Sequence, residues 1–453
     1  MRVSPKTVLN IAENQVFAGP VVIPRPQHTL SRSNISGNAL KVLYRLKSCG
    51  HQAFLVGGGV RDLLVGRSPK DFDVATDARP EQVRKLFRNC RLIGRRFRLA
   101  HVRFGREVIE VVTFRSSQSG AADDREHADS GRILRDNVYG TIDEDVWRRD
   151  FTVNALYYNI ADFSIWDYSS GMEDVSRRTL RLIGEPVARY REDPVRMLRA
   201  ARLSAKLGFS IAKRTARPIE ELAELLREVP AARLYDETLK LLHAGHAAAS
   251  LKRLREFGLL EYLFPPTDRA RGTDENGLVH KFIQAGLDNT DRRVKERKPV
   301  TPMFLFAVLL WFPIRESAEQ IRREDDCSEV EAFLEACDEV LGEQLEHTAF
   351  PRRFSAPMKE MLLMQRRFHY RRGARARRLL QHRLFRAAYD FLVLRAECGD
   401  ADPELARWWT EVQTFTPEEQ HKAFAVKRQR RSRRRRRASR RPPAGKPGDG
   451  KAG

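Results

Sequence analysis

The sequence has few of the features that mark secreted, zinc-binding or membrane-spanning proteins. Its five cysteines are an odd number, lie far apart and include no C-x-x-C pair, which argues against a disulfide framework and a zinc site. The N-terminus lacks the apolar core of a signal peptide. The longest apolar run, Met303 to Phe312, is too short to span a bilayer and ends at Pro313. We therefore expect a cytoplasmic protein with no membrane-spanning segment.

Acidic residues are in short supply. The chain has 83 Lys and Arg against 60 Asp and Glu, a formal net charge of +23. Residues 427–453 hold 13 Lys and Arg and one Asp, so +12 of that charge lies at the C-terminal end and the remainder is still basic. A pI near 10.2 makes a polyanion the expected partner, with an acidic membrane surface as the alternative.

Hydrophobic periodicity predicts a mixed α/β head followed by a body made only of helices. The expected elements of the head are a helix from Ser36, strands at Ala53–Val56 and Phe72–Val74, a helix from Pro80 through Phe87, two strands within residues 98–115 that turn at Gly105, a mobile polar loop over 116–145, and a helix followed by a strand within 143–160. From Arg178 to Phe424 only helical periodicity is visible.

The stretch "FLVGGGVRDLLVGRSPKDFDVAT", Phe54–Thr76, joins a glycine triplet to two aspartates. Asp71 and Asp73 are two residues apart, so both point to one face of the predicted strand. Two half-buried like charges are costly unless a cation lies between them. Phosphoryl-transfer sites use such carboxylates to hold two Mg²⁺ ions. The alternative is a solvent-exposed D-x-D at a strand edge.

The glycines lie where a strand gives way to a helix. The bare N–H groups of Gly57, Gly58 and Gly59, with the helix N-terminus, favour phosphate. Arg61, in the first turn of that helix, would add a bidentate contact to a phosphate. The pattern is neither G-x-G-x-x-G nor a Walker loop, and a plain strand-to-helix turn remains the alternative.

A third carboxylate has two candidates, and the sequence alone does not choose between them. Glu110 lies in "VIEVVTF" among β-branched neighbours and would find a partner in a bound metal; its alternative is a wet face on an edge strand. Asp150 lies in "RRDFTVNAL", on a predicted helix beside Arg148 and Arg149, and its alternative is a surface ion pair worth less than about 1 kcal/mol.

The stretch "RYREDPVRMLRAARLSAKLGF" predicts a capped helix. Pro194 fits the first helical position and Asp193 the N-cap. Arg196 and Arg199 are three residues apart and project from neighbouring faces. An Asp beside Arg donors can imitate the hydrogen-bonding edge of a base, and a capped helix with a solvated arginine stripe is the alternative.

The C-terminal stretch "KRQRRSRRRRRASRR" has 11 basic residues in 15 and no acidic one. Such a segment forms no core, so we expect a disordered arm that binds phosphates through counterion release, with a solubility tail as the alternative. The run Arg433, Arg434, Arg435, Arg436 and Arg437 is its centre.

These segments together resemble the polymerase-β nucleotidyltransferase superfamily, in the branch that contains tRNA CCA-adding enzymes and bacterial poly(A) polymerases. The match is ordered along the chain: "LVGGGVRDLLVG", "KDFDVAT", "RRDFTVNALYY", "DYSSGMEDV", "LRLIG" and "REDPVRMLRAARLSAKLGF". The resemblance implies that Asp71 and Asp73 bind a catalytic Mg²⁺ pair. It also implies that Gly57, Gly58 and Arg61 hold the ATP triphosphate, that Asp150 is the third functional acid or a ribose contact, and that Asp193 and Arg196, with Arg199 nearby, recognise the base without a template.

Within that branch, "LIGRRFRLAHV" (Leu92–Val102) resembles the signature of poly(A) polymerases, and the arginine-rich arm points the same way. We therefore expect an α+β fold with this division: a disordered segment 1–34, a nucleotidyltransferase head 35–177, a helical neck 178–265 with the base-recognition helix and an RNA-binding surface, a helical body 266–424, and a disordered RNA-binding tail 425–453.

The expected activity is template-independent polyadenylation: AMP from ATP is added to RNA 3′ ends in RNA processing and decay, and pyrophosphate is released. Expected partners are RNA 3′ ends, ATP and RNA-decay or RNA-chaperone proteins, and a monomer is expected. The alternatives are a CCA-adding or A-adding tRNA nucleotidyltransferase and a non-catalytic RNA-binding adaptor.

Overall fold

The computed structural model describes residues 8–10, 15–17, 19–94, 98–116, 125–127, 133–136 and 138–425. The chain divides into two compact units, residues 1–360 and 361–453. This division falls inside the predicted body, 266–424.

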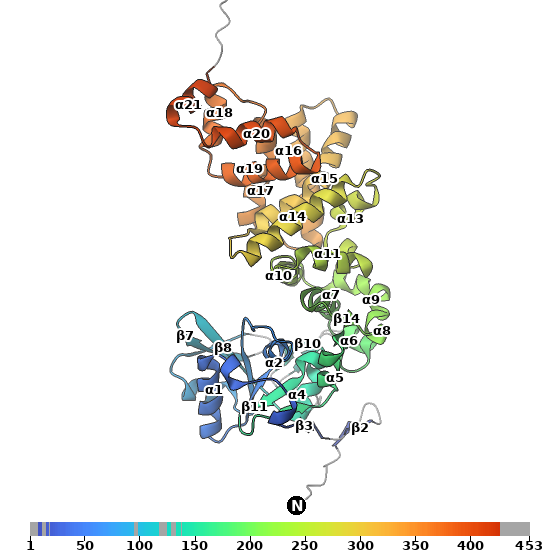
Figure 1. Ribbon diagram of the computed structural model, residues 1–453. Coiled ribbons are helices and arrows are strands. Elements are labelled where there is room, and N and C mark those ends of the chain that lie inside the picture. The colour runs from blue at the N-terminus through green and yellow to red at the C-terminus, as the bar shows by residue number, and fades with distance from the viewer. Residues whose placement is uncertain are drawn as a thin grey trace, which may run out of the picture. The chain divides into compact units, whose positions relative to one another are not determined.

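The first unit begins with an eight-stranded mixed sheet (Figure 1). In sheet order its strands are β3 (Val21–Ile23), β12 (Ile165–Asp167), β11 (Leu156–Asn159), β4 (Ala53–Val56), β5 (Asp73–Thr76), β8 (Glu107–Thr113), β7 (Leu99–Phe104) and β6 (Cys90–Ile93). Neighbouring strands are antiparallel except β5 and β8, which run parallel. Short strand pairs lie outside this sheet: β1 (Val8–Asn10) with β2 (Gln15–Phe17), β9 (Arg125–His127) with β10 (Ile133–Asp136), and β13 (Thr179–Leu180) with β14 (Ser210–Ile211).

Helices cover both faces of the large sheet. Helix α1 (Gly37–Ser48), capped by the Ser36 side chain, contacts β4, β5 and β8. Helix α3 (Pro80–Leu86) contacts β6, β7 and β8. The head also contains α2 (Gly58–Leu64), α4 (Ile142–Arg148), the short helix η3 (Thr152–Asn154) and α5 (Gly171–Ser176).

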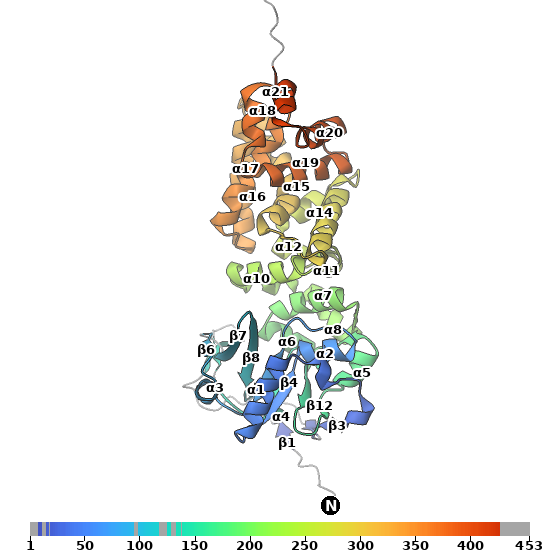
Figure 2. The same ribbon diagram turned by 60° about the vertical axis from the view of Figure 1, so that its left-hand side comes forward.

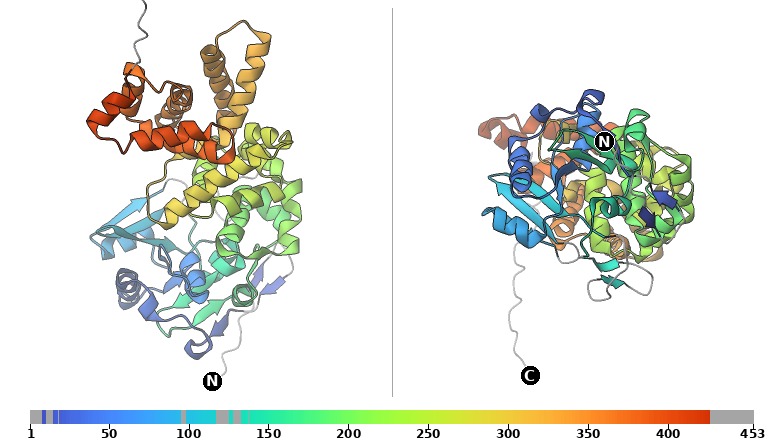
Figure 3. Two further views of the ribbon diagram at one scale, coloured as in Figure 1. Left: turned by 45° about the horizontal axis from the view of Figure 1, so that its top comes forward. Right: turned by 90° about the horizontal axis from the view of Figure 1, so that it is seen from below.

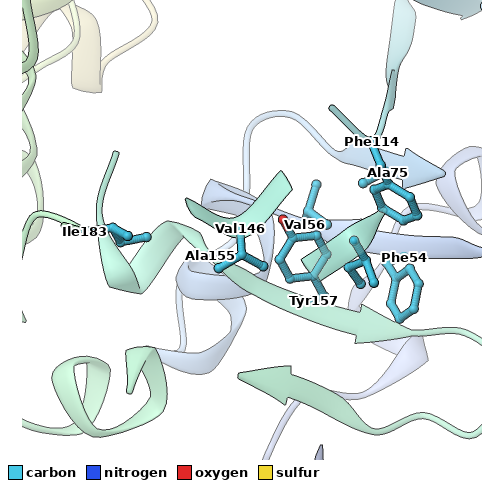
Figure 4. Packing of buried hydrophobic residues seen from close by; sticks show 9 residues of the cluster. Phe54, Val56, Ala75, Phe114, Val146, Ala155, Tyr157 and Ile183 are labelled. Carbon is cyan, nitrogen blue, oxygen red and sulfur yellow. The ribbon is translucent and has the colours of Figure 1, made fainter. Parts of the chain in front are cut away.

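The core that supports the site lies between the sheet and α4 (Figure 4). Phe54 and Val56 alternate along β4 and therefore share a face, which Tyr157 of β11 joins. Val146 of α4 packs onto that face. The ring of Phe114 is tilted against the ring of Phe54, with ring centroids 6.1 Å apart. Burial of these side chains fixes the end of β4 from which the glycine turn starts.

The remainder of the first unit is helical. Figure 2 shows α7 (Val195–Leu207) between the head and the helices that follow, and α7 contacts α10 (Ala231–Leu242) and α11 (Ala247–Glu256). The other helices are α6 (Pro186–Glu192), α8 (Lys213–Ala216), α9 (Pro218–Glu221), α12 (Leu260–Leu263), α13 (Pro265–Gly272), α14 (Leu278–Lys295), α15 (Pro302–Glu324) and α16 (Glu329–His347). Helix α17 (Arg352–Arg367) begins in the first unit and ends in the second.

The second unit contains α18 (Gly373–Leu380), α19 (Phe385–Cys398), α20 (Pro403–Val412) and α21 (Pro417–Ala423), drawn in orange to red in Figure 3. Its core is aromatic. Trp409 is fully buried, donates a hydrogen bond from its indole N–H to the carbonyl of Phe368 at 2.8 Å, and packs against Phe385 and Phe424.

The predicted α+β class, a mixed sheet with helices followed by a helical body, is confirmed. No helix among the described residues is long and apolar enough to cross a membrane. The apolar run from Met303 lies inside α15, which continues past Pro313. All five cysteines lie in described ranges and are free thiols.

Three local predictions were wrong. Residues 19–34, part of the segment predicted as disordered, include β3, which pairs with β12, and Leu30, which is buried. The ends of the predicted loop 116–145 are ordered, because Tyr139 pairs with Arg115 and α4 begins at Ile142. The parallel pair β13–β14 interrupts the region predicted to contain only helices.

Candidate active site

The glycine turn and the second aspartate lie side by side at one end of two paired strands. Val56, the last residue of β4, is the register partner of Asp73, the first residue of β5. Gly57 follows with φ of 70°, which side chains rarely adopt. A Cβ on Gly57 would lie 3.5 Å from Oδ2 of Asp73. The chain therefore brings bare backbone directly against this carboxylate.

Asp71 was predicted to lie in a strand, but it precedes β5, which starts at Asp73. The predicted alternation of side-chain direction still fits the burial pattern, since Asp71 is exposed, Phe72 is buried and Asp73 is half-buried. On the other side, Asp73 is in register with Glu110 of the parallel strand β8. The strand pairing thus places three carboxylates in neighbouring positions.

The charges of neighbouring carboxylates contribute to raising the pKa values of Asp73 and Glu110. Burial, and next the charge of Glu110, raises the pKa of Asp73 to about 6, against the opposing effect of Arg149. Burial and the charge of Asp71 raise the pKa of Glu110. Within the described part of the chain, the carboxylates of Asp71 and Asp73 have no hydrogen bond or ion pair with a protein group, and Glu110 has only His101, at 3.7 Å.

These residues fit a divalent cation in their chemistry. Carboxylate oxygens are the donors that Mg²⁺ prefers, and mutually repelling carboxylates without basic partners gain from a bound cation. Among the described residues, however, no group of three or more His, Cys, Asp or Glu already stands in a metal-holding arrangement. The choice between Glu110 and Asp150 as the third functional acid therefore rests on their surroundings.

Asp150 lies just after α4, not on the helix as predicted, and it is not a surface ion pair. Its Oδ2 accepts a hydrogen bond from Nε of Arg199 at 2.8 Å and a second from the Arg199 guanidinium. Burial would raise the pKa of Asp150, but Arg199, with hydrogen bonds from Asn154 and the Phe151 N–H, holds it well below its usual range. Asp150 is thus a permanently charged carboxylate fixed to α7.

Arg61 is buried, with a relative exposure of 3%, and its guanidinium is bound by protein groups. Its Nε and Nη2 donate to Oδ1 of Asp62, at 2.9 and 2.6 Å, and Nη1 donates to Oδ1 of Asn154. The Nδ2 group of Asn154 in turn donates to Oδ1 of Asp150 at 3.1 Å. A hydrogen-bonded series therefore connects the glycine turn with Asp150.

Arg149 occupies the position behind the glycine turn. Its Nη1 would lie 3.9 Å from a Cβ on Gly57. Its Nε donates to the Tyr157 hydroxyl at 2.6 Å, and its Nη2 donates to Oδ2 of Asp145 at 3.0 Å. The Tyr157 hydroxyl also donates to Asp145 at 2.7 Å, while its ring belongs to the head core. Arg149 is thus a buried cation held rigidly near Asp73.

Helix α7 starts one residue later than predicted, but Oδ1 of Asp193 accepts a hydrogen bond from the Val195 N–H at 3.3 Å, as an N-cap does. Oδ2 of Asp193 accepts from Nη2 of Arg233, on α10, at 2.8 Å. Burial raises the pKa of Asp193, but the hydrogen bond and charge of Arg233, together with the charge of Arg196 and the Val195 N–H, lower it further than burial raises it.

Arg196 is not part of a solvated stripe, since its relative exposure is 9%. Its Nη1 donates to Oε2 of Glu192 at 2.9 Å and to the carbonyl of Arg189 at 2.7 Å. Nη1 of Arg189 binds the same Glu192 oxygen at 2.5 Å, and Nη2 of Arg189 donates to the carbonyl of Arg149 at 2.7 Å. The base-recognition candidates are therefore tied to the strand end that carries the catalytic candidates.

Several residues that build this site were missed from sequence: Asn154, Arg149, Asp145, Tyr157, Glu192, Arg189 and Arg233. Most of them lie inside the quoted motifs, so the sequence did contain a signal that these residues belong to the site. Asp145 and Arg233 lie outside every quoted motif, and Arg233 is 40 residues from Asp193. The predicted RNA contacts Arg433, Arg434, Arg435, Arg436 and Arg437 lie outside the described residues.

Three family models match successive parts of the chain. The model described as "Poly A polymerase head domain" matches residues 53–181, "Probable RNA and SrmB- binding site of polymerase A" matches 208–271, and "Polymerase A arginine-rich C-terminus" matches 325–442.

Curated relatives cover nearly the whole chain. Poly(A) polymerase I of Escherichia coli O6:H1 is 50% identical over 90% of this chain and 89% of its own length. Poly(A) polymerase I of Haemophilus influenzae is 46% identical over 90% and 91%. The CCA-adding enzyme of Bacillus pumilus is more distant, 32% identical over 69% and 77%.

Among solved structures, the Bacillus stearothermophilus CCA-adding enzyme in complex with CTP superposes with a TM-score of 0.55, at 26% identity, over 83% of this chain and 82% of that one. A tRNA nucleotidyltransferase complexed with a primer tRNA and an incoming ATP analog gives a TM-score of 0.56 at 21% identity, over 82% and 98%, which supports the fold alone.

The fold and the site define a nucleotidyltransferase, an enzyme that joins a nucleotide to an acceptor, and the prediction of that class is confirmed. The chain belongs to the poly(A) polymerase I family. The prediction of the poly(A) polymerase branch, made from the head motifs and the arginine-rich end, is likewise confirmed, and CCA-adding enzymes are its more distant relatives.

Proposed function

We propose that this chain transfers AMP from ATP to the 3′-hydroxyl of RNA without a template, at a magnesium site built on Asp71 and Asp73. The observation that carries the proposal is the placement of Gly57 against Asp73 at the joined ends of β4 and β5. Backbone N–H groups suited to phosphate and carboxylates suited to Mg²⁺ are the two components that nucleotide transfer requires.

The reaction is an in-line displacement. The 3′ oxygen of the RNA forms a bond to the α-phosphorus of ATP and loses its proton, and the bond from that phosphorus to the bridging oxygen breaks as pyrophosphate leaves. Asp71 and Asp73, with Glu110 as the third candidate ligand, would hold the Mg²⁺ ions. When bound, these ions lower the pKa of the hydroxyl and neutralise charge on the triphosphate.

The protein groups around this centre position the substrate. Gly57 and Gly58 offer backbone donors to the triphosphate. Arg61 acts as a positioning residue, because Asp62 and Asn154 hold its guanidinium beneath the turn. Asp150, ionised and fixed by Arg199, is suited to accept a hydrogen bond from the ribose. A buried, pre-arranged network costs little reorganisation when the nucleotide binds.

Base selection falls to the N-terminal turn of α7. Asp193 supplies acceptors and Arg196 supplies donors, and both are restrained, Asp193 by Arg233 and Arg196 by Glu192. A rigid pair of this kind presents one fixed hydrogen-bonding edge. We propose that this edge selects adenine, in keeping with the family of the chain.

RNA and protein partners would contact the helical region as well. The family model that matches residues 208–271 carries the description of a probable RNA and SrmB-binding site. We propose RNA binding there and on the arginine-rich arm, contacts with RNA-decay or RNA-chaperone proteins, a cytoplasmic location and a monomeric enzyme.

A single-nucleotide extension assay tests the activity. Purified protein, Mg²⁺ and a labelled unstructured RNA are mixed with one nucleoside triphosphate at a time. We expect a long ladder with ATP alone. Addition confined to tRNA, with CTP used before a single A, would instead place the chain with the CCA-adding enzymes, and an absence of extension with every nucleotide would reject the activity.

A further inference from the structure

The second unit carries a pocket of about 510 Å³ whose lining is mostly basic. Its lining residues come from the end of α17, from α18 and from the segments that follow these helices. Both helices are labelled in Figure 1. No acidic side chain is among the residues that line it, which are Arg367, Tyr370, Arg375, Arg378, Leu379 and His382.

Three of the arginines that line this pocket have no acidic partner among the described residues. Between Gln365 and Leu384 the sequence has eight arginines and no acidic residue. Arg367, Arg375 and Arg378 are exposed, and none of the three side chains has a hydrogen bond or an ion pair within the described residues. Arginines elsewhere in this unit do pair, as Arg395 does with Asp400 at 2.7 Å. Three unpaired guanidiniums around one cavity repel each other until an anion enters.

The pocket also has a surface for stacking. Tyr370 is 50% exposed, whereas the aromatic rings of Phe368, Phe385 and Trp409 in the same unit are buried in its core. The guanidinium of Arg375 lies over its ring, 5.3 Å from the centroid. Leu379 of α18 is buried and contributes an apolar wall. Aromatic rings and guanidinium planes are the surfaces on which unpaired bases stack.

We propose that this pocket binds one nucleotide of single-stranded RNA, with its base stacked on Tyr370 and its phosphate paired with Arg375 and Arg378. The inference rests on the proposed function, in which the 3′-terminal nucleotide occupies the catalytic site of the first unit. The nucleotide held in this pocket therefore belongs to an upstream part of the strand. Unlike the arginine-rich arm, such a site would contribute affinity through stacking that added salt does not screen.

The test compares variants of the full chain for binding of a fluorescent, unstructured oligoadenylate in the absence of ATP, over a series of salt concentrations. We expect Tyr370→Ala to weaken binding about tenfold at every salt concentration, the contribution of one stacked base. Arg378→Gln should weaken binding and reduce the slope of log affinity against log salt by about 0.7, the value for one phosphate on a single strand.

Arg377→Gln is the matched control, because Arg377 is exposed on the same helix but does not line the pocket. It should change affinity less than Arg378→Gln does. Equal losses for Arg377→Gln and Arg378→Gln, or no loss for Tyr370→Ala, would overturn the proposal in favour of diffuse electrostatic binding. If AMP binds this pocket while RNA affinity is the same in every variant, the ligand is a free nucleotide and the proposal is wrong.

Primer extension by the same preparations separates this inference from the proposed function. At saturating RNA the variants should extend the primer with ATP at the rate of the parent chain. A parent chain that fails to extend RNA would reject the proposed function, and the binding comparison would still decide whether the pocket holds RNA. Thermal unfolding confirms that each exposed substitution leaves the second unit folded.

Discussion

Asp73 is the residue at which the requirements of chemistry and stability conflict most directly. Burial and the neighbouring charge of Glu110 raise its pKa to about 6, so at neutral pH the folded chain keeps a charge that its surroundings disfavour. Its position against Gly57 leaves it available to a cation and not to a protein partner. The charged form of this carboxylate therefore costs stability, as we expect of a group proposed to bind a metal ion.

This conflict predicts a pH dependence. A carboxyl group whose pKa rises on folding binds more protons in the folded chain, so stability is lost as pH rises from about 4 to about 6. Without Mg²⁺, Asp73→Asn should therefore melt at a higher temperature than the parent at pH 7, because its free energy of unfolding is larger by at most about 3 kcal/mol. At pH 4 the variant and the parent should melt at the same temperature. Calorimetric scans over this pH range, with EDTA present, measure the difference.

Glu335→Gln serves as the control, since Glu335 is an exposed carboxylate on α16. It should keep the pH dependence of the parent. Mg²⁺ at pH 7 should raise the melting temperature of the parent but not of Asp73→Asn. A parent and an Asp73→Asn variant with the same pH profile would show that Asp73 is ordinary in its ionisation.

The sequence alone identified the residues whose roles follow from local spacing. Asp71, Asp73 and Gly57 could be found because strand alternation and a glycine turn are properties of a few adjacent residues. Asn154 could not, because its link to Arg61 spans 93 residues and depends on how α2 packs against η3. The burial of Arg61 was missed for the same reason.

At the scale of elements, the contact of α10 with the start of α7 determines how firmly Asp193 is held. Arg233→Ala removes the 2.8 Å hydrogen bond to Asp193. A lost hydrogen bond to a charged group costs about 1.5–3 kcal/mol, so kcat/KM for ATP should fall about tenfold or more while the preference for ATP over CTP narrows. Single-nucleotide addition with each triphosphate gives both values.

Arg227→Ala is a suitable comparison, because Arg227 is exposed in η4 (Ala223–Glu228) and contacts only the ring of Tyr262 among the described residues. It should leave both values near those of the parent. Unchanged selectivity in Arg233→Ala would contradict the role given to the contact between α10 and Asp193.

Helices α14 and α15 meet at a position that only glycine fits. A Cβ on Gly286 would lie 2.5 Å from Cγ1 of Val308. Gly286→Ala should therefore lower the free energy of unfolding by about 1–3 kcal/mol, the usual cost of overpacking. Adding Val308→Ala should recover part of the loss, because it removes the methyl groups in the way. Thermal unfolding of the single and double variants measures this.

Gly342→Ala makes the same change in the middle of α16, where a Cβ would meet nothing within 4 Å. It should stabilise the chain by about 0.5–1 kcal/mol, since alanine is the better helix former. Equal effects of the two substitutions would mean that the close approach of α14 and α15 is not tight.

Element boundaries could be predicted from the sequence where turn residues mark them. They were missed where a segment is a strand only because it pairs with a distant strand. Gly105 turns β7 into β8, as predicted, and Gly50, with a positive φ of 84°, follows the end of α1. The three-residue strand β3 was missed because it is flanked by prolines, has exposed Val21 and Val22, and is strand-like only through its pairing with β12. Such pairing leaves no periodic signal.

At the scale of the whole molecule, charge governs how RNA is held. The arm at residues 427–453 lies beyond the described residues, and its composition predicts salt-dependent binding with little sequence preference. Deleting it should lower RNA affinity and flatten the salt dependence, yet leave slow AMP addition at high RNA concentration. Binding titrations at several salt concentrations test this, and an unchanged slope would show that the arm is not the main RNA contact.

The most direct test of the central claim is Asp73→Ala in the full chain, with primer extension by ATP and Mg²⁺ and RNA affinity measured on one preparation. We predict that nucleotide addition stops while RNA binding stays nearly intact, because Asp73 is proposed to hold Mg²⁺ beside the triphosphate and not to contact the RNA strand. Continued addition, or loss of RNA binding together with activity, would contradict the assignment of Asp73 to catalysis.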